Sequence, residues 1–311
     1  MPRPSHPTRA TGERDLLWLA VAVTAISTSG PLIRQAATPS LTLAVWRNIG
    51  GAAVLALVAV AHRPTRRAVR ANTSQQRRVS MAAGVLLGLH FLAWIPSLSF
   101  TTVSSSTALI ATQPVWAAVI ARLRGQMISR AAWFGIALAL AGTFVLSGFD
   151  FSVSKRLVVG DLLALLGGML AAAYVTVGAS ARASVASVPF ALYCFGAAGA
   201  VLVPIAIASG APLVHIPVRS WLSIGALVVG AQLLGHFVLG RVLRTTGPIV
   251  VSLAILFEVV GATLLAWAWF GERPGWGLVP SAILILAGVS IIVRLGDVGM
   301  DDVGVDAVPV V

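Results

Sequence analysis

The segment VVSLAILFEVVGATLLAWAWF, Val250–Phe270, contains a single charged residue, Glu258. An α-helix rises about 1.5 Å per residue, so an apolar run of this length crosses the ~30 Å hydrocarbon core of a bilayer. A carboxylate near the middle of such a helix costs about 2.5–3.5 kcal/mol on insertion scales, and it normally faces a protein interior or a water-filled cavity. The segment therefore predicts a transmembrane helix whose one acid is turned away from lipid.

Similar segments recur along the whole chain. Of its 311 residues, 58% are hydrophobic and 10% are charged, whereas soluble proteins carry about a quarter charged residues. Helices satisfy their own backbone hydrogen bonds in lipid, and the strands of a membrane barrel would be about half as long as these runs. We predict an all-α polytopic membrane protein with ten spans at roughly 15–35, 41–61, 80–99, 103–121, 131–148, 159–179, 188–209, 219–239, 249–270 and 277–294.

The basic residues are distributed unevenly between the two sides of these spans. Of the 22 Lys and Arg residues, only four fall in loops on the side opposite the N-terminus, namely Lys155, Arg156, Arg219 and Arg273. Arg34 and Arg47 lie within or beside helices, which leaves 16 on the N-terminal side. Cytoplasmic loops carry the excess of basic residues, so we expect a multi-pass protein of the cell membrane with both termini in the cytoplasm. This pattern also argues against nucleic acid as the partner behind the net charge of +12.

The chain repeats itself at an offset of 146 residues. Four pairs of features coincide at this offset: Asp15 with Asp161, His90-Phe91 with His236-Phe237, Leu140–Gly142 with Leu286–Gly288, and Gln126 with Glu272. We expect a cytoplasmic segment at 1–14, a first five-helix repeat at 15–148, a second at 159–294 and a disordered cytoplasmic tail at 295–311. Because five is odd, the second repeat would be inverted relative to the first. Inverted repeats are typical of secondary transporters, whose binding site lies near the midplane between the halves.

The two repeats carry motifs that resemble the EamA-type members of the drug/metabolite transporter superfamily. The first is QPVWAAVIARLRGQMISRAAWFGIALALAG (113–142), with the family's proline at Pro114 but Gln126 in place of the usual acid. The second is FEVVGATLLAWAWFGERPGWGLVPSAILILAG (257–288), which keeps the acid at Glu272 but has Val259 in place of proline. AVWRNIGGAAVLAL (44–57) resembles the family's second helix. The resemblance implies ten spans, two repeats, and amino acids, related metabolites or drugs as substrates.

Glu258 is the leading candidate for a substrate or proton site. It lies about halfway along its predicted helix, and an acid removed from water can take up and release a proton during a transport cycle. It would then bind a substrate amine or couple transport to protons. Alternatively, it forms a hydrogen bond to a neighbouring helix without a role in transport. Gln113 occupies the equivalent place in the first repeat if the register slips by one residue, and we expect both side chains at a shared site.

His90 and His236 lie in the third helix of each predicted repeat. A neutral imidazole can bridge helices, bind a polar substrate group or transfer protons near neutral pH. A packing role is equally compatible with their positions. Gln232 precedes His236 by one helical turn and is expected on the same face. Neither histidine has a second ligand at i+3 or i+4, so we predict no metal site.

Arg47 is the one strongly basic residue well inside a predicted helix. Its position about six residues from the helix end favours a side chain that snorkels to the membrane interface. The alternative is that its guanidinium receives a substrate carboxylate or pairs with Glu258. Trp94 is one of several tryptophans placed deeply enough to line a cavity, although packing would explain it as well.

The residues favour a secondary transporter over two other classes. We expect an exporter of small polar metabolites such as amino acids or of drugs, working by alternating access, with proton coupling left open. A membrane channel or scaffold subunit is the alternative, although no ring of charges resembling a selectivity filter is visible. An intramembrane enzyme is disfavoured because neither H-E-x-x-H nor a Ser-His couple at motif spacing occurs. No Walker-type motif is present, which disfavours an ATP-driven machine within this chain, and we expect no cofactor. Small residues on the fifth helix of each repeat predict close packing or a homodimer.

Overall fold

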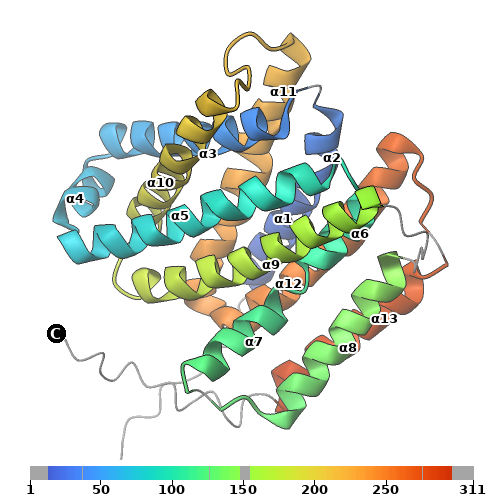
Figure 1. The fold of residues 1–311 in the computed structure, drawn as a ribbon. Coiled ribbons are helices and arrows are strands. Elements are labelled where there is room, and N and C mark those ends of the chain that lie inside the picture. The colour runs from blue at the N-terminus through green and yellow to red at the C-terminus, as the bar shows by residue number, and fades with distance from the viewer. Residues whose placement is uncertain (1–12, 37, 126, 148–154, 275, 296–311) are drawn as a thin grey trace, which may run out of the picture.

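The computed structural model describes residues 13–36, 38–125, 127–147, 155–274 and 276–295. Within these ranges the chain is helical and has no β-strand. Figure 1 shows long helices gathered into one bundle, with α8 and α13 side by side along one edge. The predicted all-helical fold is therefore confirmed. Gln126 and the tail 296–311 lie outside the described residues.

Six helical stretches have the length and apolarity needed to cross a bilayer. They comprise α1 (Glu13–Ser27) with α2 (Ser29–Gln35), α3 (Ser40–Ala61), α5 (Ser74–Ser97), α9 (Lys155–Arg182), α10 (Ser187–Ala208), and α11 (Val218–Ala226) with the π-helix η1 (Leu227–Phe237). The chain is a multi-pass membrane protein on this ground. The prediction of ten spans is therefore supported at six positions by length and composition.

The remaining helices are shorter in their described apolar parts or are more polar. They are α4 (Arg63–Ala71), α6 (Val103–Ile110), α7 (Gln113–Leu123), α8 (Arg130–Ser147), α12 (Val238–Phe270) and α13 (Leu278–Leu295). Two predicted boundaries differ from the structure. The span predicted at 103–121 is divided between α6 and α7, and the loop predicted between 239 and 249 is helical because α12 begins at Val238. Continuing the helix keeps its backbone groups hydrogen-bonded in lipid.

Two prolines account for two of the helix breaks. In a continuous helix each backbone N–H donates to the carbonyl four residues earlier, and proline has no N–H. Pro31 cannot donate to Ser27, and α1 ends at Ser27. Pro114 likewise cannot donate to Ile110, where α6 ends. Each break produces a short helix, α2 after the first and α7 after the second.

Helices from the two halves of the chain pack mainly against each other. α5 packs against α9 and α10, α3 packs against α10 and η1, and α1 packs against η1 and α12. α6 and α7 contact α9, while α6 also contacts α12. This interleaving places side chains of the first half within reach of side chains of the second, so a site in the middle of the bundle draws on both.

The α8–α13 pair is held by glycines at close approach. A Cβ added at Gly142 would lie 2.8 Å from the Ser281 carbonyl oxygen, and one added at Gly288 would overlap the Gly135 carbonyl oxygen. Small residues allow this approach, and packing contacts stabilise helix pairs in lipid. The packing role predicted for these helices is therefore seen within one chain, and a homodimer stays a prediction.

We predict that Gly288→Leu lowers the thermal stability of the detergent-solubilised protein, because the added side chain must separate α8 from α13. Overpacking of this kind costs about 1–3 kcal/mol. The midpoint of heat-induced unfolding, followed by size-exclusion chromatography, measures the effect. Ser290→Leu is the control, since Ser290 is exposed on the same helix; an equal loss in both variants would contradict the contact.

Candidate functional site

Arg47 lies at the centre of the interleaved helices rather than at a membrane interface. Its side chain in α3 is 0% exposed. Nε donates to the Gln232 Oε1 at 2.7 Å, and Nη1 donates to the Ser29 Oγ at 3.0 Å. The snorkelling predicted for Arg47 is therefore wrong. The buried acceptors on η1 and α2 hold the guanidinium inside the protein, where hydrogen bonds offset part of its desolvation.

Gln232 connects this cation to a further amide. Its Nε2 lies 3.4 Å from the Asn48 Oδ1, while Asn48 Nδ2 donates to the Ala44 carbonyl at 2.8 Å. Gly51 of α3 permits the approach of η1, because a Cβ there would lie 3.0 Å from the Gln232 Cγ. Gln232 sits in a π-helix, a distortion that occurs frequently at functional sites. Ser29 and Asn48 were not predicted from the sequence, although Asn48 directly follows the arginine.

An aromatic wall from α5 borders the guanidinium. The Arg47 Cζ lies 4.1 Å from the centroid of the Phe91 ring, a cation–π contact. Phe91 meets His236 edge-on at 6.3 Å between centroids. His90 stacks with Trp94 at 5.6 Å. Both histidines predicted as candidates from the repeat thus lie close to the Phe91 ring.

His90 has a defined hydrogen-bond partner on α9. Its Nδ1 lies 2.9 Å from the Gly167 carbonyl oxygen. A carbonyl only accepts, so Nδ1 carries the proton in this contact and Nε2 is left as an acceptor. The bridge joins α5 of the first half to α9 of the second. This geometry realises the helix-bridging role considered for His90.

Glu258 of α12 is half-buried and is close enough to Arg47 for the two charges to interact. No basic nitrogen in the described part of the chain lies within 4.0 Å of its carboxylate. Glu258 and Arg47 therefore form no direct ion pair. Gln113 begins α7 and is half-buried, and the described contacts do not connect it to Arg47. We name Arg47, Gln232, Asn48, Ser29 and Phe91 the Arg47 cluster.

Two buried donors in this region have no partner in the described structure, the Nη2 of Arg47 and the Nε1 of Trp94. An unpaired buried donor costs about 1–3 kcal/mol, and more when it is charged. A ligand oxygen would satisfy either group. Arg47 Nη2 in particular suits a carboxylate, which forms short charge-assisted hydrogen bonds with a guanidinium.

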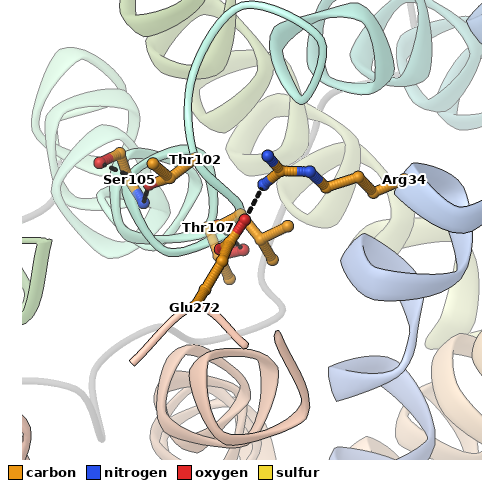
Figure 2. Close-up of polar contacts among 6 residues, drawn as sticks. Arg34, Thr102, Ser105, Thr107 and Glu272 are labelled. Atoms are coloured by element: carbon orange, nitrogen blue, oxygen red, sulfur yellow. Dashed lines mark hydrogen bonds and ion pairs between the residues drawn. The ribbon is translucent and has the colours of Figure 1, made fainter. Parts of the chain in front are cut away.

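One end of the bundle is joined by an ion pair between the halves. Arg34 Nη1, near the end of α2, pairs with Glu272 Oε1, which follows α12 (Figure 2). Gly271 adopts φ 71° directly after α12 and turns the chain toward α2. The Arg34 Cζ also lies 5.8 Å from the centroid of Phe270. Thr107 of α6 is drawn in the same close-up (Figure 2), and its side chain is 3% exposed.

The comparisons with known proteins agree with this architecture. The model of the EamA-like transporter family matches residues 14–148 and again residues 158–294. The chain belongs to this family. One solved crystal structure of a protein aligns over 91% of this chain and 98% of its own, with 20% identity and a TM-score of 0.71. That likeness concerns the fold alone, and a comparison with curated proteins gives no significant match.

Membership in the EamA-like family makes this protein a membrane transporter of the drug/metabolite transporter superfamily and not an enzyme. The family model matches twice, once in each half, and the two matches together cover nearly the whole chain. The Arg47 cluster takes Arg47 and Phe91 from the first matched region and Gln232 from the second. The cluster is thus assembled across the two regions of this transporter.

We predict that Gln232→Leu destabilises the transporter by about 1–3 kcal/mol, because it removes the acceptor of Arg47 Nε while the cation stays buried. Gln232→Glu keeps an acceptor in place and should retain the stability of the wild type. Thermal unfolding of the three proteins in the same detergent measures the difference. Similar midpoints for Gln232→Leu and the wild type would contradict the importance of this hydrogen bond.

Proposed function

We propose that this EamA-like transporter moves a small polar metabolite across the cell membrane by alternating access, in the direction of export. The observation that carries the proposal is the Arg47 cluster, a buried polar group to which both halves of the chain contribute. Relative movement of the halves changes the surroundings of a site between them. The site then opens to one side of the membrane at a time.

Ten spans arranged as two inverted repeats are part of this proposal. The packing partners exchange between the halves: α5 against α9 corresponds to η1 against α1, and α6 and α7 against α9 correspond to α12 against α1. α3 with α10, and α8 with α13, pair equivalent helices directly. This pattern supports a two-fold relation between the halves. Five spans in each half would make the relation inverted, and the basic loops favour both termini in the cytoplasm.

The chemistry of the site favours a substrate with a carboxylate, an amine or both. Arg47 Nη2 offers a buried donor without a partner, which suits a carboxylate. Glu258 lies where its charge reaches Arg47 without an ion pair, so a substrate amine or a proton can bind there. His90, His236 and Trp94 border the same region through Phe91. Gln113, at the start of the short helix α7, remains a candidate for contact with the substrate.

We predict that Glu258→Gln leaves the protein folded but abolishes substrate accumulation driven by a pH gradient, because an amide does not titrate. Glu258→Asp keeps a titratable acid and should retain part of the accumulation. Both are measured in proteoliposomes with amino acids and amines as test substrates. Undiminished accumulation by Glu258→Gln would show that Glu258 does not couple transport to protons. Movement only down the gradient in the wild type would favour the alternative of a channel.

The Arg34–Glu272 ion pair is proposed to close the outer end of the pathway. It joins α2 of the first half to Glu272, which follows α12 of the second. Thr107 of α6 is buried against α2 at this end. A Cβ at Gly30 would lie 3.8 Å from the Thr107 Oγ1. Separation of α2 from α12 would therefore expose position 107.

We predict that Arg34→Gln raises the reaction rate of Thr107→Cys with an external, membrane-impermeant maleimide several-fold. The ion pair is partly exposed, so its loss is worth about 0.2–1 kcal/mol, or up to about fivefold in population. The native Cys194 is buried, and labelling of the protein without Thr107→Cys measures its background reaction. Arg273→Gln is the matched control, because Arg273 is exposed beside Glu272. Equal labelling in the two backgrounds would contradict closure by this pair.

A further inference from the structure

A groove lies beneath α4, separate from the Arg47 cluster. Its volume is about 530 Å³. Pro64, Thr65 and Ala68 of α4 line one side, and Ala186–Pro189 at the start of α10 line another. Phe237 and Arg241, where η1 passes into α12, complete the lining. Arg241 is the one charged residue among these, so the groove is largely apolar with a cation at its border.

The short helix α4 turns its cationic face away from this groove. Successive helix residues are rotated by about 100°, which puts Pro64, Thr65 and Ala68 on one face. The opposite face carries Arg63, Arg66, Arg67 and Arg70. No residue of α4 is buried. An amphipathic helix of this kind, with arginines on its polar face, is suited to lie in the interfacial plane of a membrane.

α4 is held in place over the groove by the neighbouring helices. It packs against α3 and α10, and the Tyr193 hydroxyl of α10 donates to the Val69 carbonyl of α4 at 2.9 Å. Arg77 donates from Nη2 to the Arg70 carbonyl at 3.3 Å. The arginine face is therefore presented by a defined helix and not by an irregular loop.

The described part of the protein places no carboxylate close to these arginines. The sequence has no Asp or Glu between Asp15 and Asp150. Among the described residues, the one ion pair joins Arg34 and Glu272, so the four arginines of α4 and Arg241 have no carboxylate within 4.0 Å. A cluster of basic residues beside a membrane helix attracts anionic lipids, by about 1 kcal/mol for each residue near the surface.

The surface next to the groove is suited to hydrocarbon. α3 leads directly into α4 and exposes Leu57 and Val60 near its end, at 68% and 67% of their surface. A soluble anion would bind the arginines here but would leave the apolar lining without a ligand. A phospholipid has both parts, a phosphate for the arginines and an acyl chain for the groove.

We propose that the groove beneath α4 binds an anionic phospholipid of the leaflet at that end of the bundle. The headgroup phosphate lies at Arg241 on the border of the groove, the outward-facing α4 arginines add to the positive charge of this surface, and one acyl chain enters between Ala68 and Val188. The site is distinct from the proposed transport site. Lipid binding can therefore be tested without knowing the transported substrate.

The test is retention of phosphatidylglycerol against phosphatidylcholine by the full chain in a neutral detergent, counted by native mass spectrometry. We expect wild type to retain phosphatidylglycerol several-fold better. Arg241→Gln should lower this preference about fivefold. Ala68→Trp should lower retention as well by filling the groove while the charge is unchanged. Arg122→Gln is the matched control, since it removes an exposed arginine of α7 that lies outside the groove lining.

Several results would overturn the proposal. Equal retention of both lipids by wild type would remove the charge selectivity. An equal loss of the phosphatidylglycerol preference in Arg122→Gln and Arg241→Gln would show that the preference follows the net charge of the protein and not the groove. Competition by soluble glycerophosphoglycerol as strong as that by the lipid would show a phosphate site that does not use the groove. Selective retention that appears only in the full chain with Asp301→Asn and Asp302→Asn would identify the acidic tail as the occupant instead. Unfolding midpoints near that of the wild type show that each variant is folded.

Discussion

The structure depends on the burial of one cation, Arg47. A guanidinium held away from water is tolerated only where several acceptors and an aromatic face surround it. α3 alone cannot provide them. Ser29 comes from α2, Phe91 from α5 and Gln232 from η1, so three further helices must be in place before the charge is satisfied. The requirement explains why the helices of the two halves interleave at this level of the bundle.

The two halves keep the same plan but differ in the residues that carry charge. His90 and His236 occupy equivalent positions and both lie near Phe91. The position equivalent to Arg47 is Tyr193, whose hydroxyl instead anchors α4. The prolines that divide the first-half helices, Pro31 and Pro114, have no equivalents at the same offset. The short helices α2 and α7 therefore belong to the first half, while α12 of the second half is continuous and carries Glu258.

The arginines of this transporter have three different surroundings, and each suggests a different role. Arg47 is enclosed and hydrogen-bonded, and it retains one donor without a partner. Arg34 is partly exposed and pairs with Glu272 across the halves. The arginines of α4 face outward, and no carboxylate of the described residues pairs with them. These three groups carry the same charge. They differ in exposure and in the distance to a carboxylate, and these two properties suggest their different roles.

Composition and hydropathy were sufficient to predict a helical membrane protein, since lipid leaves few backbone structures possible. The offset repeat identified His90 and His236, and the apolar surroundings identified Glu258. The direction of the Arg47 side chain could not be predicted, because a side chain near a helix end can reach either the interface or the protein interior. Only helices distant in the sequence decide between these outcomes. Ser29 and Asn48 were missed for the same reason: a lone serine or asparagine has no periodic pattern, and its role exists only when another helix brings a partner within 3 Å or so.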